Sequence, residues 1–238
     1  MELALAVPDA APLPRIRPST PLPSNPFAAY GSNNPADPDM LTAFLPPPAA
    51  QHISPDEDAA CRTRLDALGV KYTPESGVQF VSDACTVVGP LKVSALGAGL
   101  SLAPTATMNC RTAETVARWM QEVVAPAAEK HLKTRPTGIA QASAFVCRPR
   151  NNVEGAKLSE HATGNALDVA SIGLEGRPAF EIHARDDTEP DERDFQAEIR
   201  AGACGLFTTV LGPGTNAAHA THFHLDLAQR RGGSHVCE

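Results

Sequence analysis

The prediction of the fold starts from residues 159–168, which read Ser159-Glu160-His161-Ala162-Thr163-Gly164-Asn165-Ala166-Leu167-Asp168. A second segment, near the end of the chain, reads His219-Ala220-Thr221-His222-Phe223-His224-Leu225-Asp226. The patterns predict strands over residues 165–170 and 222–227, and Gly164 permits a bend before the first strand. Side chains two residues apart in a strand share a face, so we expect His222 and His224 to lie on one face of a sheet.

Three helices and five further strands are expected around these two segments. The helices are predicted over residues 54–68, with Ser54 as N-cap, 112–131 and 190–204. Pro126 is expected to kink or locally break the second helix, because proline lacks an amide proton. The further strands are predicted over residues 78–81, 86–94, 138–146, 179–184 and 206–210. Helices and strands do not alternate regularly, which predicts an α+β fold, mainly an antiparallel sheet with helices packed on it.

The composition is that of a globular chain and excludes several classes of protein. The chain has 238 residues, and 42% of them are hydrophobic, which is enough for a buried core. Its formal net charge is −7 and it has no basic run, so we expect no nucleic-acid partner. No stretch approaches the roughly 20 apolar residues that span a bilayer, so we expect no transmembrane segment.

The beginning of the chain differs from the rest in its proline content. Residues 1–55 hold 13 of the 22 prolines, including the run Pro46-Pro47-Pro48. Such a composition favours polyproline II structure or disorder and buries little. We therefore expect a Pro-rich extended or disordered tail over residues 1–55 and a globular domain over residues 56–238.

The six cysteines indicate an oxidising compartment. They form an even set without a C-x-x-C pair, which favours three disulfides over a zinc ribbon or buried cytosolic thiols. Their pairing stays open, and the most local pair is Cys61–Cys85. Apolar residues 3–7 are too short for the core of an export signal, which needs about 7–15 residues. We expect a periplasmic or secreted protein, with the signal missing from this chain or with export by another route.

The histidines and acids of the two segments have the chemistry of a metal site. A neutral imidazole is the commonest metal ligand in proteins. Gly164 would let a loop with His161 fold over the start of a strand with Asp168, near His222 and His224. Two imidazoles and one carboxylate suit a catalytic zinc ion, which keeps a coordination position for water. The same ligand types also make the facial triad of non-haem iron oxygenases, and this alternative stays open.

Several motifs in these segments resemble those of known families. Ser159-x-His161-x-x-Gly164-x-Ala166-x-Asp168 matches the S-x-H-x-x-G-x-A-x-D motif of zinc peptidases that cleave D-Ala-D-Ala and peptidoglycan cross-bridges. His222-x-His224 resembles their second motif, H-x-H. The wider pattern, with the spaced cysteines and Cys147-Arg148, is closer still to the C-terminal domain of bacterial extensin-like proteins. The resemblance covers about residues 58–238.

The resemblance implies a role for each matching residue. It makes His161, Asp168 and His224 the ligands of a zinc ion on the sheet, within a domain stabilised by disulfides. It places His222 beside the metal, His219 as a further active-site histidine and Arg148 against a developing oxyanion. The resemblance thus implies that His222, His219 and Arg148 are catalytic and that His161, Asp168 and His224 bind the metal.

One position departs from the pattern of the resembling peptidases. Some branches carry a glutamate as general base where this chain has Thr221, which cannot accept the proton. The base is then expected to be His222 or His219, with Asp168 sharing the work as an alternative. Glu160 is a weaker candidate, because its side chain is expected to point elsewhere. Asp226 lies on the strand face of His224 and could orient that imidazole.

Two functions follow from the resemblance. The first is a zinc metallopeptidase that hydrolyses amide bonds of peptidoglycan stem peptides or cross-bridges, as a carboxypeptidase or an endopeptidase. The alternative is a non-catalytic cell-wall binding module that keeps the fold and the metal. Both functions have peptidoglycan as the partner, and Zn²⁺ is the expected cofactor.

Overall fold

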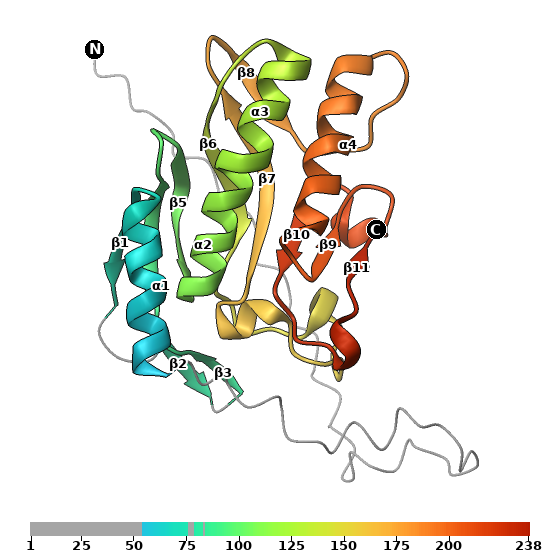
Figure 1. Ribbon diagram of the computed structural model, residues 1–238. Helices are drawn as coiled ribbons and strands as arrows, with labels where there is room; N and C mark the ends of the chain where they lie inside the picture. The colour runs from blue at the N-terminus through green and yellow to red at the C-terminus, as the bar shows by residue number, and fades with distance from the viewer. Residues whose placement is uncertain (1–53, 76–78, 83) are drawn as a thin grey trace, which may run out of the picture. The chain divides into compact units, whose positions relative to one another are not determined.

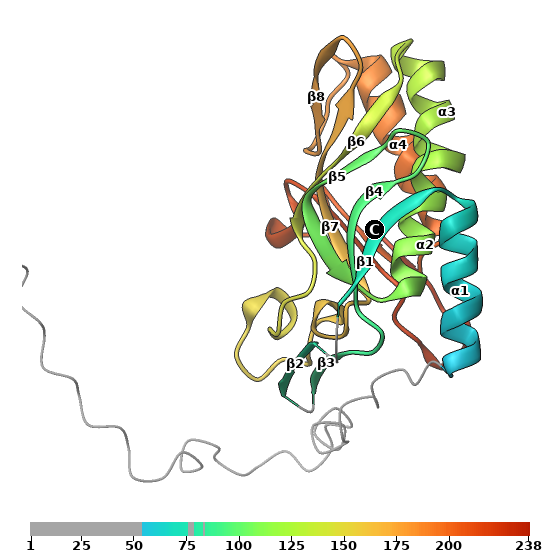
Figure 2. The same ribbon diagram turned by 90° about the vertical axis from the view of Figure 1, so that its left-hand side faces the viewer.

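A nine-stranded mixed sheet, covered on one face by helices, forms the framework of the protein (Figures 1 and 2). The computed structural model describes residues 54–75, 79–82 and 84–238, all within one compact unit, Leu45–Glu238. The predicted Pro-rich tail therefore lies outside the described residues, apart from its last two positions. The predicted α+β class, with a mostly antiparallel sheet, is confirmed.

The strands of the large sheet follow the order β1-β4-β5-β6-β7-β10-β9-β11, and β8 pairs with β7 outside this order. Two pairs, β5 with β6 and β9 with β11, are parallel, and the other pairs are antiparallel. A separate hairpin is formed by β2 (Gln79–Ser82) and β3 (Cys85–Val87). The strands of the large sheet are β1 (Val70–Pro74), β4 (Leu91–Leu96), β5 (Ser101–Met108), β6 (Pro136–Ser143), β7 (Ala166–Leu174), β8 (Arg177–Glu181), β9 (Thr209–Leu211), β10 (Phe223–Asp226) and β11 (Val236–Cys237).

Helix α1 (Pro55–Ala67) begins as the sequence predicts. The Ser54 side chain accepts a hydrogen bond from the Glu57 amide, and the Glu57 carboxylate accepts one from the Ser54 amide. This reciprocal capping box satisfies amide groups that have no partner inside the helix. After the helix the chain turns at Gly69, whose φ of 75° favours glycine, and enters β1.

The second helical segment runs without interruption from residue 110 to residue 132. It consists of α2 (Cys110–Arg118), a π-helical turn (Trp119–Val124), α3 (Ala125–Ala127) and a second π-helical turn (Ala128–Leu132). The helix does not break at Pro126; π-helical turns lie on both sides of the proline instead, and proline lacks an amide proton. The Trp119 indole donates a hydrogen bond to the Ile199 carbonyl at 2.9 Å. That bond connects this segment to α4 (Pro190–Cys204), the third predicted helix.

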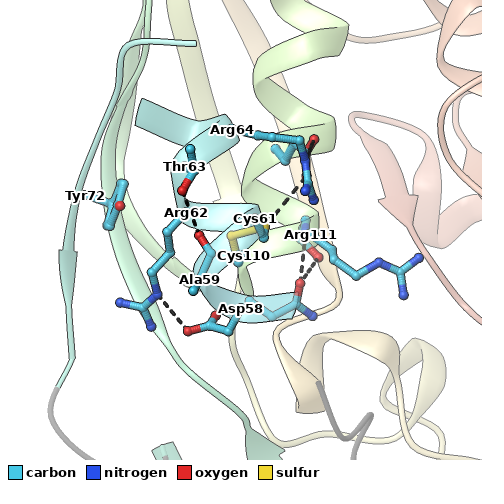
Figure 3. The surroundings of a disulfide bond; sticks show 12 residues. Asp58, Ala59, Cys61, Arg62, Thr63, Arg64, Tyr72, Cys110 and Arg111 are labelled. Carbon is cyan, nitrogen blue, oxygen red and sulfur yellow. Dashed lines mark hydrogen bonds and ion pairs between the residues drawn. A yellow bond between two sulfur atoms is a disulfide. The ribbon is translucent and has the colours of Figure 1, made fainter. Parts of the chain in front are cut away.

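Three disulfides join distant elements, and they are Cys61–Cys110, Cys85–Cys147 and Cys204–Cys237. The number of disulfides is as predicted, but the pairing Cys61–Cys85 is wrong. Figure 3 shows the reason: Cys61 on α1 faces Cys110, the first residue of α2, because the two helices pack side by side. Packing between helices, and not proximity in the sequence, selects the partner.

Three strands were not predicted, and their sequences explain why. β5 contains Pro104, which argues against a strand in the middle of a sheet. It pairs with β6 through residues 101–103 and with β4 chiefly through residues 106–108, so the proline lies between two ladders. β1 and the two-residue β11 contain few buried side chains. The single strand predicted over 86–94 is two strands, because Gly89 and Pro90 form a turn between β3 and β4.

No helix in the described part of the chain is long and apolar enough to cross a membrane.

Candidate metal centre

Two neighbouring strands, β7 and β10, bring the two sequence segments together. They pair antiparallel, and in their register His224 lies directly opposite Asp168. Leu167 and Val169 belong to the apolar core beneath the helices, so the intervening Asp168 points to the opposite face of the sheet. The segment after β6 lies on that side, away from the helices (Figure 2). All four residues of β10 and residues 166–169 of β7 are buried, so the three converging side chains lie largely in the interior.

His161 reaches the same place from the short 3₁₀ helix Glu160–Thr163, just before β7. The turn between the two elements is made by Gly164, with a φ of 63°. A Cβ at this position would lie 2.8 Å from Val87 Cγ1 and 3.1 Å from the Asn109 amide nitrogen. Glycine is therefore needed both for the left-handed conformation and for the close packing of this turn.

The three residues predicted as metal ligands converge on one point. His161 Nε2 lies 3.1 Å from Asp168 Oδ1 and 3.2 Å from His224 Nδ1, and the last two atoms are 2.9 Å apart. His161, Asp168 and His224 are 0%, 3% and 8% exposed, respectively. Within the described residues they form a group suited to hold a metal ion.

The hydrogen bonds on the outer side of each ligand fit the binding of a cation. His161 Nδ1 donates to the Ala144 carbonyl at 2.6 Å, so its Nε2 keeps a free lone pair. His224 Nε2 donates to Asp226 Oδ2 at 3.0 Å, so its Nδ1 faces the centre. A metal ion with bonds of about 2.0–2.2 Å separates its ligand atoms by roughly 3.0–3.5 Å. The donor set and its spacing therefore fit a metal ion.

Asp226 is itself held in place by a buried network. Its Oδ1 accepts hydrogen bonds from the Thr209 hydroxyl and, at 2.9 Å, from the Ala228 amide. Arg230 donates to the Thr209 hydroxyl oxygen at 2.6 Å. Such partners orient a histidine ligand and raise its basicity. The expectation that Asp226 could orient His224 agrees with this geometry.

The same contacts change the pKa values of the ligands in the metal-free protein. Burial alone would lower the pKa of His224, but its hydrogen bonds to Asp168 and Asp226 outweigh burial and raise the pKa to about 9. Burial would raise the pKa of Asp168, but the neighbouring His161 and His224 side chains hold it well below its usual range. Without a metal, a proton on His224 therefore provides the positive charge between the carboxylates.

The three residues predicted as catalytic lie around the metal centre. His222 directly precedes β10, and its Nε2 lies 3.7 Å from Asp168 Oδ1. The ring of His219 lies 5.3 Å from that of His222 and 5.8 Å from that of His224, measured between centroids. Arg148 Nη2 lies 3.4 Å from Asp168 Oδ2. The structure thus gathers all six predicted site residues in one place.

The two flanking histidines are neutral at pH 7. Burial and the neighbouring imidazoles of His224 and His222, which disfavour a further positive charge, lower the pKa of His219 to about 4. Burial also lowers the pKa of His222. His219 Nδ1 lies 2.9 Å from the Asn216 side-chain oxygen and donates to it, which leaves Nε2 as the acceptor. Each of these rings can therefore accept a proton.

Glu160 points away from the metal centre and is engaged elsewhere. Its Oε2 accepts a hydrogen bond from the side-chain amide of Asn165 at 2.7 Å, and its Oε1 lies 3.8 Å from Arg150 Nη2. Asn165 also contacts Asn109, which caps α2. Glu160 therefore stabilises the turn, in agreement with the expectation that it is a weaker candidate for the general base.

Sequence reasoning missed several residues that support the site. They are the Ala144 carbonyl, Thr209, Arg230 and Asn216. A backbone carbonyl leaves no mark in the sequence. Thr209 and Arg230 become visible only once the pairing of β9 with β10 is known. Asn216 lies three residues before His219, and this spacing was the one signal available.

Comparison with known proteins places the chain in a family. No curated protein and no solved structure gives a significant match to it. A family model described as Extensin-like protein C-terminus matches residues 59–238, which include the metal centre and all six cysteines. The chain belongs to the extensin-like protein C-terminus family.

Proposed function

We propose that the protein is a zinc-dependent hydrolase that cleaves amide bonds in the stem peptides or cross-bridges of peptidoglycan. One observation carries the proposal: ligand atoms of His161, Asp168 and His224 face one another at 2.9–3.2 Å, with three functional side chains beside them. The resemblance of the two motifs to those of zinc peptidases favours zinc over iron. When bound, zinc supplies a Lewis acid that polarises a carbonyl group and acidifies water.

The proton transfer is assigned to His222, with His219 as the second candidate. Both rings are neutral at pH 7, because burial lowers the pKa of each. His222 lies nearer to the ligand Asp168, at 3.7 Å. A neutral imidazole in this position can take a proton from the attacking water and return it to the leaving amine. Thr221, which stands where some peptidases carry a glutamate, has no comparable capacity.

Arg148 is assigned to the carbonyl oxygen of the scissile bond. Its guanidinium lies beside Asp168, and the Arg148 side chain is 23% exposed, so a substrate can reach it from solvent. A fixed positive charge there stabilises the negative charge that develops on the oxygen during attack. Asp168 in turn restrains the guanidinium before substrate arrives.

The cellular location belongs to the same proposal. Three disulfides are compatible with a periplasmic or extracellular protein, because such bonds persist in oxidising compartments. Peptidoglycan lies in that space, so the enzyme and its substrate would meet there.

The second candidate function is a cell-wall binding module without catalytic activity. Thr221 in the place of a catalytic acid favours it, and so does the contact that already engages Arg148 with Asp168. A module of this kind would keep the metal as a structural element.

Mass spectrometry of defined peptidoglycan fragments separates the two functions. The substrates are a cross-linked dimer and a monomer with a pentapeptide stem, each incubated with zinc-loaded, chelated and zinc-restored protein. Cleavage of the dimer identifies an endopeptidase, and loss of the terminal alanine identifies a carboxypeptidase. His224→Ala protein is the control for a contaminating hydrolase. One zinc ion per chain with both fragments intact would contradict hydrolysis and support the binding module.

A further inference from the structure

The segment that carries Arg148 is poorly fixed by packing. Residues 145–158 connect β6 to the turn with His161, and none of their side chains is buried. Even its apolar members are open to solvent, with Val146 36% and Val153 57% exposed. Burial of apolar side chains normally holds a loop against the body of a protein, and here it contributes little.

Hydrogen bonds hold the two ends of this segment to each other. The Arg150 amide donates to the Lys157 carbonyl at 2.9 Å, and the Ser159 amide donates to the Arg148 carbonyl at 3.1 Å. Ala144, the residue just before the segment, contacts a candidate metal ligand, because His161 Nδ1 donates to the Ala144 carbonyl. That contact precedes Arg148 in the chain, and it holds the His161 ring separately from the hydrogen bond between the Ser159 amide and the Arg148 carbonyl.

A disulfide connects this segment to a fixed part of the molecule. Cys147, the residue before Arg148, is bonded to Cys85, which is 1% exposed. Cys85 begins β3, and Val87 in the same strand packs closely against the Gly164 turn beside His161. β3 is therefore a common support for the metal-ligand turn and, through the disulfide, for Arg148.

We propose that the Cys85–Cys147 disulfide is a positioning element that holds Arg148 at the metal centre. This inference rests on the proposed hydrolase function, in which Arg148 stabilises the developing oxyanion. The bond acts on the rate of the chemical step and leaves the metal ligands in place. Cys85 and Cys147 are positioning residues, because they act through Arg148.

The test compares two disulfide-free variants. Cys85→Ala/Cys147→Ala removes the proposed positioning bond, and Cys61→Ala/Cys110→Ala is the matched control. Cys85–Cys147 spans 62 residues and Cys61–Cys110 spans 49. Removal of either bond is therefore expected to raise the conformational entropy of the unfolded chain by a similar amount. We expect the first variant to retain one metal ion per chain and to lose about 10- to 100-fold in kcat, as for a misplaced catalytic group. The control should keep its kcat.

Arg148→Ala shows whether the disulfide acts through the arginine. Alone, it should lower kcat by about 10²–10³-fold. In the Arg148→Ala background, removal of Cys85–Cys147 should cause no further loss, because coupled residues are not additive. The inference would be overturned if removal of Cys85–Cys147 lowered kcat as much in the Arg148→Ala background as in the wild type. It would also be overturned if the Cys61→Ala/Cys110→Ala control lost as much kcat, or if the Cys85→Ala/Cys147→Ala variant lost its metal.

Amide hydrogen exchange separates failure of this inference from failure of the proposed function. The Cys85→Ala/Cys147→Ala variant should exchange faster at Arg150 and Ser159, whose amides hydrogen-bond within the segment. The Cys61→Ala/Cys110→Ala control should not. If the wild-type protein hydrolyses no fragment, the hydrolase proposal fails, and exchange alone decides whether the disulfide holds the segment. Unchanged exchange in the first variant would overturn the positioning role.

Discussion

His224 lies between two carboxylates, and this placement fits the role of a metal ligand. Nδ1 faces Asp168 and the metal centre, whereas Nε2 is held by Asp226. A carboxylate behind a ligating imidazole fixes the tautomer that presents a lone pair to the metal. Thr209 and Arg230 fix the carboxylate in turn, so the orientation of one ring depends on residues from three segments.

Replacement of Asp226 should weaken metal binding without removing a ligand. The side chain of Asp226→Asn has one acceptor oxygen where aspartate has two. It therefore cannot accept the hydrogen bond from His224 and also those from Thr209 and Ala228. We expect metal affinity to fall by about 10–100-fold, as for other lost partners of ligating histidines. Competition with a coloured chelator measures the change, and Asp194→Asn on the surface is the control. An unchanged affinity would show that His224 does not need this partner.

At the scale of elements, the turn between the 3₁₀ helix Glu160–Thr163 and β7 places His161 relative to Asp168. Gly164 makes this turn with a positive φ, and a Cβ at this position would lie 2.8 Å from Val87 Cγ1. Substitution by alanine therefore adds a strained backbone and a steric clash together.

Gly164→Ala should reduce the free energy of unfolding by about 2–4 kcal/mol, combining left-handed strain with overpacking. Gly155→Ala is the matched control, because its φ is 80° and no atom lies within 4 Å of the added Cβ. Strain alone predicts about 1–2 kcal/mol for the control. Urea denaturation of the metal-free proteins measures both. Equal losses would mean that packing against Val87 is unimportant.

Elements with a strong local pattern could be predicted from the sequence. The Ser54 cap located the start of α1, and the helices at 110–132 and 190–204 were found within a few residues. Strand β5 was missed because Pro104 is tolerated between two ladders, which only the pairing reveals.

The candidate metal ligands could be named because they match the motifs of the resembling peptidases, and local chain geometry favours their convergence. The His161 and Asp168 segment contains its own turn, and the alternation of a strand places His224 and Asp226 on one face. The disulfide partners could not be predicted, because they depend on how helices and loops pack in three dimensions. The same holds for Thr209, which reaches Asp226 across a strand pair.

For the whole molecule, the buried charges make the stability of the metal-free protein depend on pH. The folded-state pKa of His224 is about 9, above its ordinary value of 6.5, so its protonation stabilises the fold below pH 6.5. This contribution is lost as the pH rises through 9. The lowered pKa values of Asp168 and Asp226 act in the opposite direction, and their contribution is lost as the pH falls below about 4.

We therefore expect the melting temperature of metal-free protein to fall between pH 6.5 and pH 9. Stabilisation by added zinc should increase over the same range, because the metal no longer competes with the proton on His224. Calorimetry of metal-free and zinc-saturated samples provides the measurement, with His224→Gln as a control that lacks the titrating ring. A melting temperature constant across this range would contradict the assigned charge of His224.

The central claim is that His161, Asp168 and His224 hold one metal ion, with His222 beside it as a proton carrier. Native mass spectrometry with metal analysis tests this claim on the wild-type, His224→Ala and His222→Ala proteins. We predict one zinc ion per chain for the wild type and for His222→Ala, and none for His224→Ala, which loses one of three ligands. Loss of zinc from His222→Ala as complete as that from His224→Ala, or a wild-type protein that binds no metal, would contradict the account.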